Sequence, residues 1–298
     1  MAIEGPWTHE QAVVGDVRLH YVTAGDEDDP LVVLLHGFPE FWYSWRHQIP
    51  ALADSGFRVV APDMRGYNTS EKPPGVANYR MEKLVGDVVG LIEHFDREQA
   101  HVVGHDWGGG VAWETAMRRP EAVEKLAALN APHTGRFREA LHSNPEQMGR
   151  SLYVLYFQLP WLPEFTLGVR DCAGVAEMLR ETSEPGTFGE ADLRRYREAA
   201  CRPGALTAML NYYRAGFREE LREQAGRLLG GKRPGNVVRA PTLLLWGEQD
   251  PALDVELTEG VERWVPDLRV ERLPEATHWV QNDAPEAVTE LLSAFVRE

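Results

Sequence analysis

Apolar runs typical of buried strands alternate with helical patterns over two parts of the chain. Predicted strands occupy residues 31–35, 58–63, 100–103, 125–130, 241–246 and 268–273. The run at 31–35 is continuous, as expected for a strand buried on both faces of a sheet. Between strands, apolar residues recur at helical spacing, as at Leu84, Val88 and Leu91. This alternation predicts an α/β fold with a mostly parallel sheet and helices on both faces.

Further elements complete this pattern. Residues 12–23 alternate apolar and polar side chains around a Gly15-Asp16 turn, which predicts a hairpin. Helices are expected near residues 254–265 and at residues 285–296. The chain shows no internal repeat and no low-complexity tail.

The middle of the chain breaks the alternation. Residues 133–233 contain no apolar strand runs, only helical patterns separated by Pro and Gly. Aromatic residues gather in this segment: Tyr153, Tyr156, Phe157, Trp161, Phe165, Tyr196, Tyr212, Tyr213 and Phe217. We therefore expect a core made of residues 1–132 and 234–298, with residues 133–233 inserted as a helical cap over the sheet.

One stretch of the sequence contains the candidate nucleophile. Residues 99–114 read QAHVVGHDWGGGVAWE, which is an apolar run, a glycine-flanked turn and then a helical pattern. Strand, sharp turn and helix in this order describe a nucleophile elbow, which holds one side chain clear of the sheet. Its central position is Asp106, where most such elbows hold Ser. A lone G-x-D-x-G is weak evidence, because Gly and Asp also form ordinary loops.

Two more polar residues, Asp250 and His278, follow predicted strands. Each has an ordinary explanation, because Asp250 precedes Pro251 in a common turn sequence and His278 is one of ten histidines. Their order after Asp106 is nucleophile, acid and histidine, which is the order that α/β-hydrolases use. The three residues together predict a catalytic triad.

An aspartate nucleophile limits the reactions that such a site could catalyse. Carboxylate attack on a saturated carbon gives an alkyl ester that water can hydrolyse, whereas serine would form a stable ether. Asp106 therefore indicates an electrophilic sp3 carbon with a leaving group. His278, supported by Asp250, would activate water against the ester. The backbone N–H groups of Phe38 and Trp107 would form the oxyanion hole.

Six motifs, in this order, resemble the epoxide hydrolases of the α/β-hydrolase fold, and the soluble type most closely. They are HGFPEFWYSWRHQ, DMRGY, GHDWGG, LNAPH, WGEQD and HWVQ. The match covers residues 31–133 and 240–285 without large gaps. The resemblance implies that Asp250 is the triad acid, since the strand where some relatives keep the acid ends here in Asn130.

The resemblance also implies details of the site. A cis peptide bond is expected before Pro39. Glu40 matches the family's acidic residue near the hydrolytic water, although a surface charge is nearly as good an explanation.

Two cap tyrosines are implied as well. Opening an epoxide releases an alkoxide, which the family protonates or hydrogen-bonds with two tyrosines. Tyr153 and Tyr213 match these positions, and Tyr156 and Tyr212 are close rivals. Tyr153, Tyr156 and Phe157 lie at helical spacing, which packing alone would also produce.

The favoured function is an epoxide hydrolase that makes a vicinal diol through an Asp106 ester, without a metal or organic cofactor. The alternative is a haloalkane or haloacid dehalogenase, which shares the Asp nucleophile. Haloalkane dehalogenases often have Asn where Phe38 stands, and fluoroacetate dehalogenases have arginines where Trp107 and Gly110 stand. Both differences from the dehalogenase sequences count against a dehalogenase. A non-catalytic binding protein would not require all three triad residues.

Composition limits the expected binding partners and the expected cellular compartment. The 298-residue chain has a formal net charge of −15, which argues against nucleic acid or an anionic membrane as partner. Cys172 and Cys201 lack metal-binding spacing, and nothing indicates an oxidising compartment. The start of the chain has no apolar core for a signal peptide, and no apolar run reaches membrane-spanning length. We expect a cytoplasmic monomer or homodimer that acts on a small apolar epoxide and water.

Overall fold

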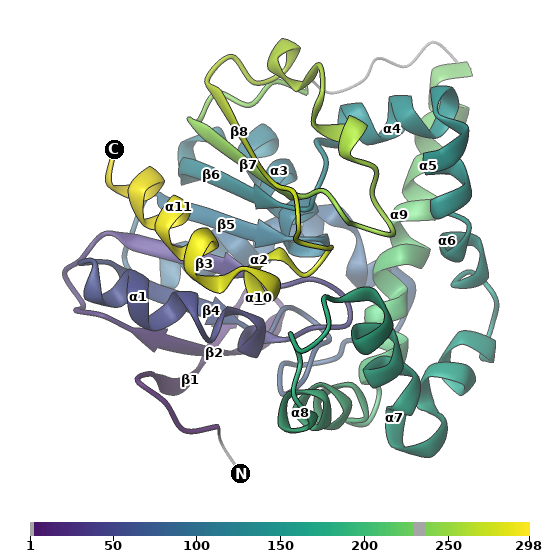
Figure 1. Cartoon of the computed structure of the whole chain (residues 1–298), viewed down its shortest axis with the longest axis horizontal. Helices are drawn as coiled ribbons and strands as arrows, with labels where there is room; N and C mark the ends of the chain where they lie inside the picture. Colours follow the sequence, from purple (N-terminus) through teal and green to yellow (C-terminus); the bar gives the residue numbers. More distant parts are fainter. Residues whose placement is uncertain (1–2, 229–235) are drawn as a thin grey trace.

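The structure, a computed structural model, describes residues 3–228 and 236–298. Its strands are β1 Thr8–Val14, β2 Val17–Ala24, β3 Leu31–Leu35, β4 Arg58–Pro62, β5 Ala100–His105, β6 Val123–Leu129, β7 Thr242–Gly247 and β8 Leu268–Leu273. They form one sheet in the order β1-β2-β4-β3-β5-β6-β7-β8 (Figure 1). β1 with β2 and β2 with β4 are antiparallel, and all other neighbours are parallel. The predicted hairpin and mostly parallel sheet are confirmed.

Helices cover both faces of this sheet. Outside the segment between β6 and β7, the helices and 3-10 turns are η1 Trp42–Trp45, α1 Gln48–Asp54, η2 Val76–Tyr79, α2 Met81–His94, α3 Trp107–Arg118, η3 Pro120–Ala122, η4 Val255–Thr258, η5 Val261–Arg263, α10 Val280–Asp283 and α11 Pro285–Arg297. α1 and α11 lie in front of the sheet in Figure 1, and α2 and α3 lie behind it. No helix in the described residues is both long and apolar enough to cross a membrane.

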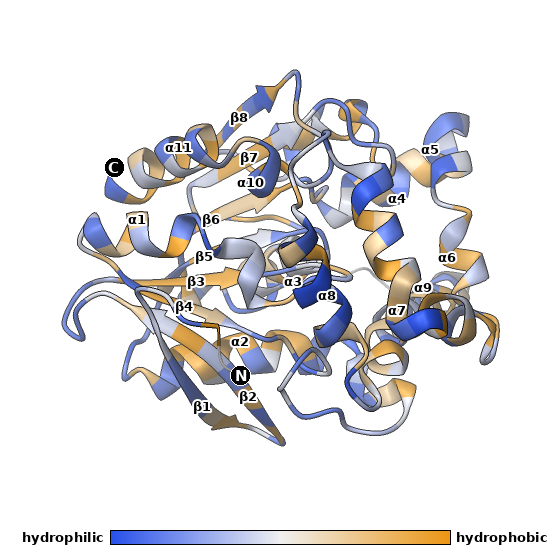
Figure 2. Ribbon diagram, turned by 60° about the horizontal axis from the view of Figure 1, so that its bottom comes forward, coloured by the Kyte–Doolittle hydropathy of each residue, from blue (hydrophilic) through white to orange (hydrophobic). Residues whose placement is uncertain are grey.

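Burial follows the apolar pattern of the sequence. All five residues of β3 are buried, because β3 lies between β4 and β5 in the middle of the sheet. Along α2, Leu84, Val88 and Leu91 are buried on one stripe. Figure 2 shows the same distribution, with orange on the central strands β3 and β6 and blue on much of α8.

The prediction of a helix near residues 254–265 is wrong. This stretch forms two short 3-10 turns, η4 and η5. The Asp254 side chain accepts a hydrogen bond from the Glu256 amide and starts the first turn. Gly260 then adopts a left-handed φ of 69°, which interrupts any continuous helix at that point.

The described part of the segment between β6 and β7 contains helices joined by loops and no strand. Its helices are α4 Thr134–Ser143, α5 Pro145–Arg150, α6 Tyr153–Tyr156, α7 Leu162–Thr182, α8 Glu190–Ala200 and α9 Ala205–Leu228. We call these six the cap helices. They stand at the side of the molecule toward which the arrows of β3 and β5 point (Figure 1). The predicted boundary between residues 233 and 234 lies outside the described residues, and the division into core and cap stays a prediction.

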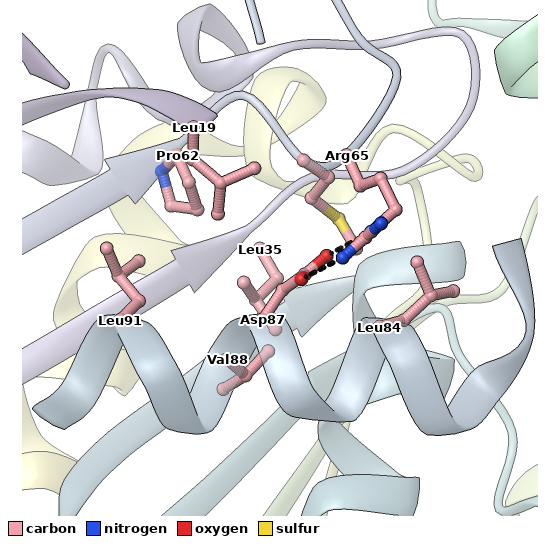
Figure 3. Close-up of a pocket in the computed structure, with 9 residues that line it drawn as sticks. Leu19, Leu35, Pro62, Arg65, Leu84, Asp87, Val88 and Leu91 are labelled. Atoms are coloured by element: carbon pink, nitrogen blue, oxygen red, sulfur yellow. Dashed lines mark hydrogen bonds and ion pairs between the residues drawn. The ribbon is translucent and has the colours of Figure 1, made fainter. Parts of the chain in front are cut away.

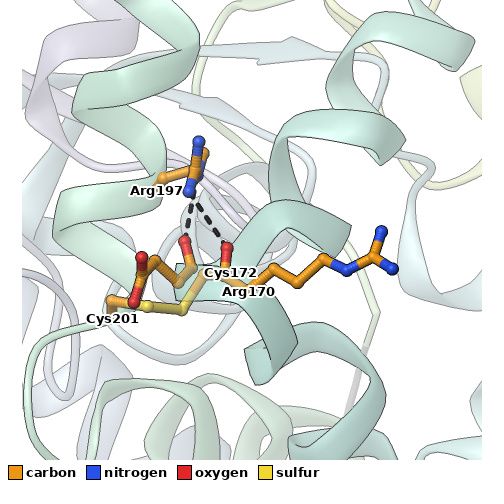
Figure 4. The surroundings of a disulfide bond; sticks show 5 residues. Arg170, Cys172, Arg197 and Cys201 are labelled. Carbon is orange, nitrogen blue, oxygen red and sulfur yellow. Dashed lines mark hydrogen bonds between the residues drawn. A yellow bond between two sulfur atoms is a disulfide. The ribbon is translucent and has the colours of Figure 1, made fainter.

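A disulfide joins Cys172 in α7 to Cys201 at the end of α8. The chain reaches it through a left-handed turn, in which Arg170, Asp171 and Cys172 have φ between 52° and 57°. Arg197 donates to the carbonyl oxygens of Arg170 and Asp171 and so holds this turn against α8 (Figure 4). Sequence analysis gave the two cysteines no role. Disulfides are rare in reducing compartments, so this pair weighs against the cytoplasmic location, which stays a prediction.

Candidate active site

A sharp turn joins β5 to α3. β5 ends at His105, Asp106 follows with φ 49° and ψ −119°, and α3 begins at Trp107. A Cβ atom on Gly104 would collide with the backbone of Gly108, so the turn closes only around glycine. A positive φ is uncommon for Asp and is sustained here by the strand and helix on either side. The turn holds the Asp106 carboxylate at the carboxyl end of the strand.

Two backbone amides reach this carboxylate. The Phe38 N–H donates to Asp106 Oδ1 at 2.8 Å, and the Trp107 N–H donates to the same carboxylate. The Phe38–Pro39 peptide bond is cis, as the resemblance implies. Gly37 permits the close approach of this loop, because a Cβ atom there would collide with Asp106. The two amides predicted for the oxyanion hole thus both contact the predicted nucleophile.

His278 lies between the two predicted carboxylates. Its Nδ1 is 2.6 Å from Asp250 Oδ2, and its Nε2 is 3.7 Å from Asp106 Oδ2. Asp250 follows β7 and His278 follows β8, so neighbouring parallel strands bring both to one edge of the sheet. Asp250 Oδ1 accepts hydrogen bonds from the amides of Ala252 and Leu253 at 2.8 and 2.9 Å. Asp250 therefore fixes one side of the His278 ring and leaves the other side facing Asp106.

These contacts set the charges of the three groups. Burial acts to raise the pKa of Asp250, but His278 and the Asn130 amide hold it below its usual value. Burial acts to lower the pKa of His278, yet Asp250 and Asp106 raise it to about 9. Burial raises the pKa of Asp106 in spite of the neighbouring His278. The free site therefore holds a positively charged His278 at neutral pH, with Asp250 as its main partner.

Asn130 is a site residue whose role sequence reasoning missed. Its Nδ2 donates to Asp250 Oδ2 at 2.7 Å, and its Oδ1 accepts from the Gly247 amide at 2.8 Å. Asn130 follows β6, next to β7 in the sheet, so it lies beside Asp250, the predicted acid. The sequence did place Asn130 at the end of a predicted strand, as it placed Asp250 and His278. Sequence analysis used this position only to argue that the triad acid does not lie there.

Glu40 is fully buried, so the surface-charge explanation is wrong. Its carboxylate accepts from the Gly37 amide and from Gln281 Nε2, both at 2.9 Å, and lies 2.7 Å from His105 Nδ1. Burial acts against its charge, but His105 and the Gly37 amide lower the pKa of Glu40 to about 2. His105 Nε2 in turn lies 2.8 Å from the backbone oxygen of His278. Sequence reasoning assigned no role to His105 or Gln281, although His105 directly precedes the predicted nucleophile.

The predicted cap tyrosines, Tyr153 and Tyr213, lie together near the elbow. Their ring centroids are 5.9 Å apart, and the Tyr213 ring lies 5.0 Å from Trp107 and 5.3 Å from Phe38. Although 37% of Tyr153 is exposed, its hydroxyl group is enclosed by protein. Burial, with a further contribution from the charge of Asp106, raises the pKa of both hydroxyls. Both groups therefore remain protonated donors at neutral pH.

The rival tyrosines direct their hydroxyls elsewhere. The Tyr156 hydroxyl lies 2.6 Å from Thr166 Oγ1 within the cap helices. The Tyr212 hydroxyl donates to the backbone oxygen of Arg65 at 2.7 Å. The geometry therefore favours Tyr153 and Tyr213 over these neighbours as groups that could reach a ligand of Asp106.

Arg65 belongs to a buried ion pair between α2 and the sheet (Figure 3). Its Nε and Nη2 donate to the two Asp87 oxygens at 2.7 and 2.6 Å, beside a cavity of about 10 Å³. Burial raises the pKa of Asp87 to about 6 against the attraction of Arg65. The pair steadies the loop to which Tyr212 is bonded, but none of the predicted site residues lines this cavity. The described residues contain no group of three or more His, Cys, Asp or Glu that could hold a metal ion.

Comparisons with known proteins show the family of this chain. The sequence profile of the alpha/beta hydrolase fold matches residues 30–285. AB hydrolase superfamily protein YfhM of Bacillus subtilis is 42% identical, over 94% of this chain and 95% of that protein. Epoxide hydrolase 4 of Homo sapiens is 38% identical, over 95% of this chain and 76% of its own length. The crystal structure of an inhibitor-bound epoxide hydrolase from Bacillus megaterium is similar, with a TM-score of 0.86 and 34% identity over 97% of this chain and 100% of that one.

Proposed function

We propose, from the premise that this chain belongs to the epoxide hydrolases of the α/β-hydrolase fold, that it hydrolyses an epoxide to a vicinal diol. One arrangement carries the proposal: a carboxylate at the elbow lies close to two enclosed phenols. Asp106 supplies the carboxylate, and Tyr153 and Tyr213 supply the phenols. An epoxide needs both at once, because its attacked carbon and its leaving oxygen are joined in a ring of three atoms.

In the first step, an oxygen of Asp106 forms a bond to one epoxide carbon. The bond between that carbon and the ring oxygen breaks, and its electron pair moves to the oxygen. One of Tyr153 and Tyr213 gives its proton to this alkoxide and becomes a phenolate, and the other donates a hydrogen bond. The raised pKa of each tyrosine keeps its proton in place until the alkoxide forms. The product is a hydroxyalkyl ester of Asp106.

In the second step, water attacks the carbonyl carbon of this ester. Ester formation removes the negative charge of Asp106, which is one cause of the raised pKa of His278. His278 then passes its proton to the phenolate that ring opening leaves, and the neutral ring takes a proton from the attacking water, while Asp250 stabilises the resulting cation. The amides of Phe38 and Trp107 stabilise the tetrahedral oxyanion. The bond between the Asp106 carbonyl carbon and the alkyl oxygen then breaks, and the diol leaves with the proton held by His278. The remaining carboxylic acid returns its proton to His278, which restores the Asp106 carboxylate and the starting charges.

We assign substrate binding to the cap, residues 133–233. The Phe157 ring lies 4.9 Å from Tyr213 and 5.5 Å from Phe38, so the surroundings of the two hydroxyls are largely aromatic. Such surroundings favour an epoxide with an apolar aryl or alkyl group. The steps above require only this substrate and water, with no metal or organic cofactor.

A side-by-side turnover assay with styrene oxide and 1-bromobutane tests the function. We expect diol from the first substrate and no bromide from the second, and no product from an Asp106→Ala control. Bromide without diol would replace this proposal with a dehalogenase, in which Tyr153 and Tyr213 only pack. If neither diol nor bromide forms, the result would favour a non-catalytic binding protein.

A further inference from the structure

A buried glutamine of the cap helices contacts the loop that holds the triad acid. Gln147 in α5 is fully buried. Its Nε2 donates to the backbone oxygen of Ala252 at 3.0 Å, and its Oε1 accepts from the Asp254 amide at 2.8 Å. The second N–H of the amide donates to Ser151 Oγ at 3.0 Å. Both ends of the side-chain amide are therefore engaged, and two of the three bonds go to the acid loop.

The same loop orients the Asp250 carboxylate. The amides of Ala252 and Leu253 donate to Asp250 Oδ1, which leaves Oδ2 for His278. Gln147 binds the backbone groups on either side of Leu253. The Ala252 carbonyl and the Leu253 N–H belong to one peptide unit, so fixing the carbonyl also fixes the direction of an amide that holds the carboxylate.

Arg150 adds a second contact from the same helix. Its Nη1 donates to the backbone oxygen of Asp250 at 2.7 Å, and its Nη2 donates to Glu146 at 2.6 Å. α6, which begins at Tyr153, follows a few residues later. One short piece of the cap helices thus supports the acid loop and presents a proposed proton donor.

We propose that Gln147, assisted by Arg150, is a positioning residue that holds the 250–254 loop so that Asp250 faces His278. The inference rests on the proposed function, and it assigns Gln147 to the second step of that reaction. Ring opening depends on Asp106 and the tyrosines, none of which Gln147 contacts by a hydrogen bond. Loss of Gln147 should therefore slow ester hydrolysis and spare ester formation.

Rapid-mixing measurements of the two steps with styrene oxide test this proposal on Gln147→Leu, which keeps a similar volume but loses all three bonds. We expect ester hydrolysis to slow about tenfold while ester formation stays within about twofold of wild type. Mass spectrometry should show the ester accumulating, as in a His278→Gln reference whose hydrolysis is stalled. The pH midpoint of ester hydrolysis should also fall, because a misdirected Asp250 supports the His278 cation less well.

Tyr43→Phe is the matched control. It removes the hydrogen bond of 2.8 Å from Tyr43 to Asp192 in α8 and the one that Tyr43 accepts from Arg195. Among the described residues, neither partner is hydrogen-bonded to the 250–254 loop, so both rates should stay unchanged. Arg150→Met provides a second test, with a smaller slowing expected, and decides the matter if Gln147→Leu does not fold. Wild-type hydrolysis in the variants that fold, or equal slowing of both steps, would overturn the inference. A wild-type protein that forms no diol would instead overturn the proposed function.

Discussion

Asp106 and Asp250 are both buried carboxylates, yet their contacts give them different properties. Asp250 accepts hydrogen bonds from His278, from Asn130 and from two loop amides, and these lower its pKa. Asp106, among the described residues, accepts hydrogen bonds from two backbone amides, those of Phe38 in the loop after β3 and of Trp107, and has a raised pKa. A carboxylate that is less stabilised by its surroundings loses less when it forms a bond to carbon. The difference is consistent with Asp106 as nucleophile and Asp250 as the permanent charge.

The tyrosine pair gives a prediction for single residues. We expect Tyr153→Phe or Tyr213→Phe to slow ring opening by about 100-fold, and the double variant to leave almost none, because the alkoxide loses its donors. Single-turnover ester formation measures this step directly. Tyr156→Phe is the control, since that hydroxyl bonds Thr166 instead, and it should behave as wild type. Normal ring opening in the double variant would show that both rings only pack.

Between elements, sequence reasoning succeeded where a pattern is local. Five continuous apolar residues in β3 indicate a buried strand, and the glycines around Asp106 indicate a sharp turn, because short-range sterics decide both. It failed at residues 254–265, where apolar spacing predicted a helix but the left-handed Gly260 interrupts the chain. It also predicted that Asp106, Asp250 and His278 lie together, because each follows a strand whose end lies at one edge of the sheet. The structure brings the three side chains together, and their roles stay a prediction.

Contacts between distant elements were beyond this reasoning. Gln147 and the acid loop are more than a hundred residues apart, and nothing in the sequence around a single glutamine indicates that its amide is buried. The disulfide has the same character, since a separation of 29 residues between Cys172 and Cys201 carries no signal of its own. Such partners are set by how α5, α7 and α8 pack, which local spacing does not encode.

The disulfide gives a prediction for the cap helices. Exchanging both cysteines for serine should lower the free energy of unfolding by roughly 3 kcal/mol, because the unfolded chain regains the freedom of the closed loop. Denaturant titration measures this difference, and reduction of the wild type should bring it to the level of the variant. Thiol titration of the unfolded, unreduced protein should find no free thiol. Two reactive thiols in protein purified without reductant would contradict the pairing.

At the scale of the whole molecule, the sheet brings together residues that are far apart in the chain. Asp106 follows β5, Asp250 follows β7 and His278 follows β8, and the parallel strands deliver all three to one edge. The cap helices, which lie between β6 and β7 in the chain, approach this edge as well. His278 therefore meets its two carboxylates only in the folded chain, so its protonation is coupled to folding.

This coupling predicts how stability depends on pH. The pKa of His278 rises from 6.5 to about 9 on folding, so the folded state binds the proton more tightly than the unfolded state. Its contribution to stability is complete below pH 6.5 and is lost as pH rises toward 9. Unfolding in urea at pH 6, 7, 8 and 9 should thus show a steeper decline for wild type than for His278→Gln. Equal slopes would mean that the imidazolium contributes nothing. Asp106→Asn should give an intermediate slope, because Asp250 raises the pKa of His278 more than Asp106 does.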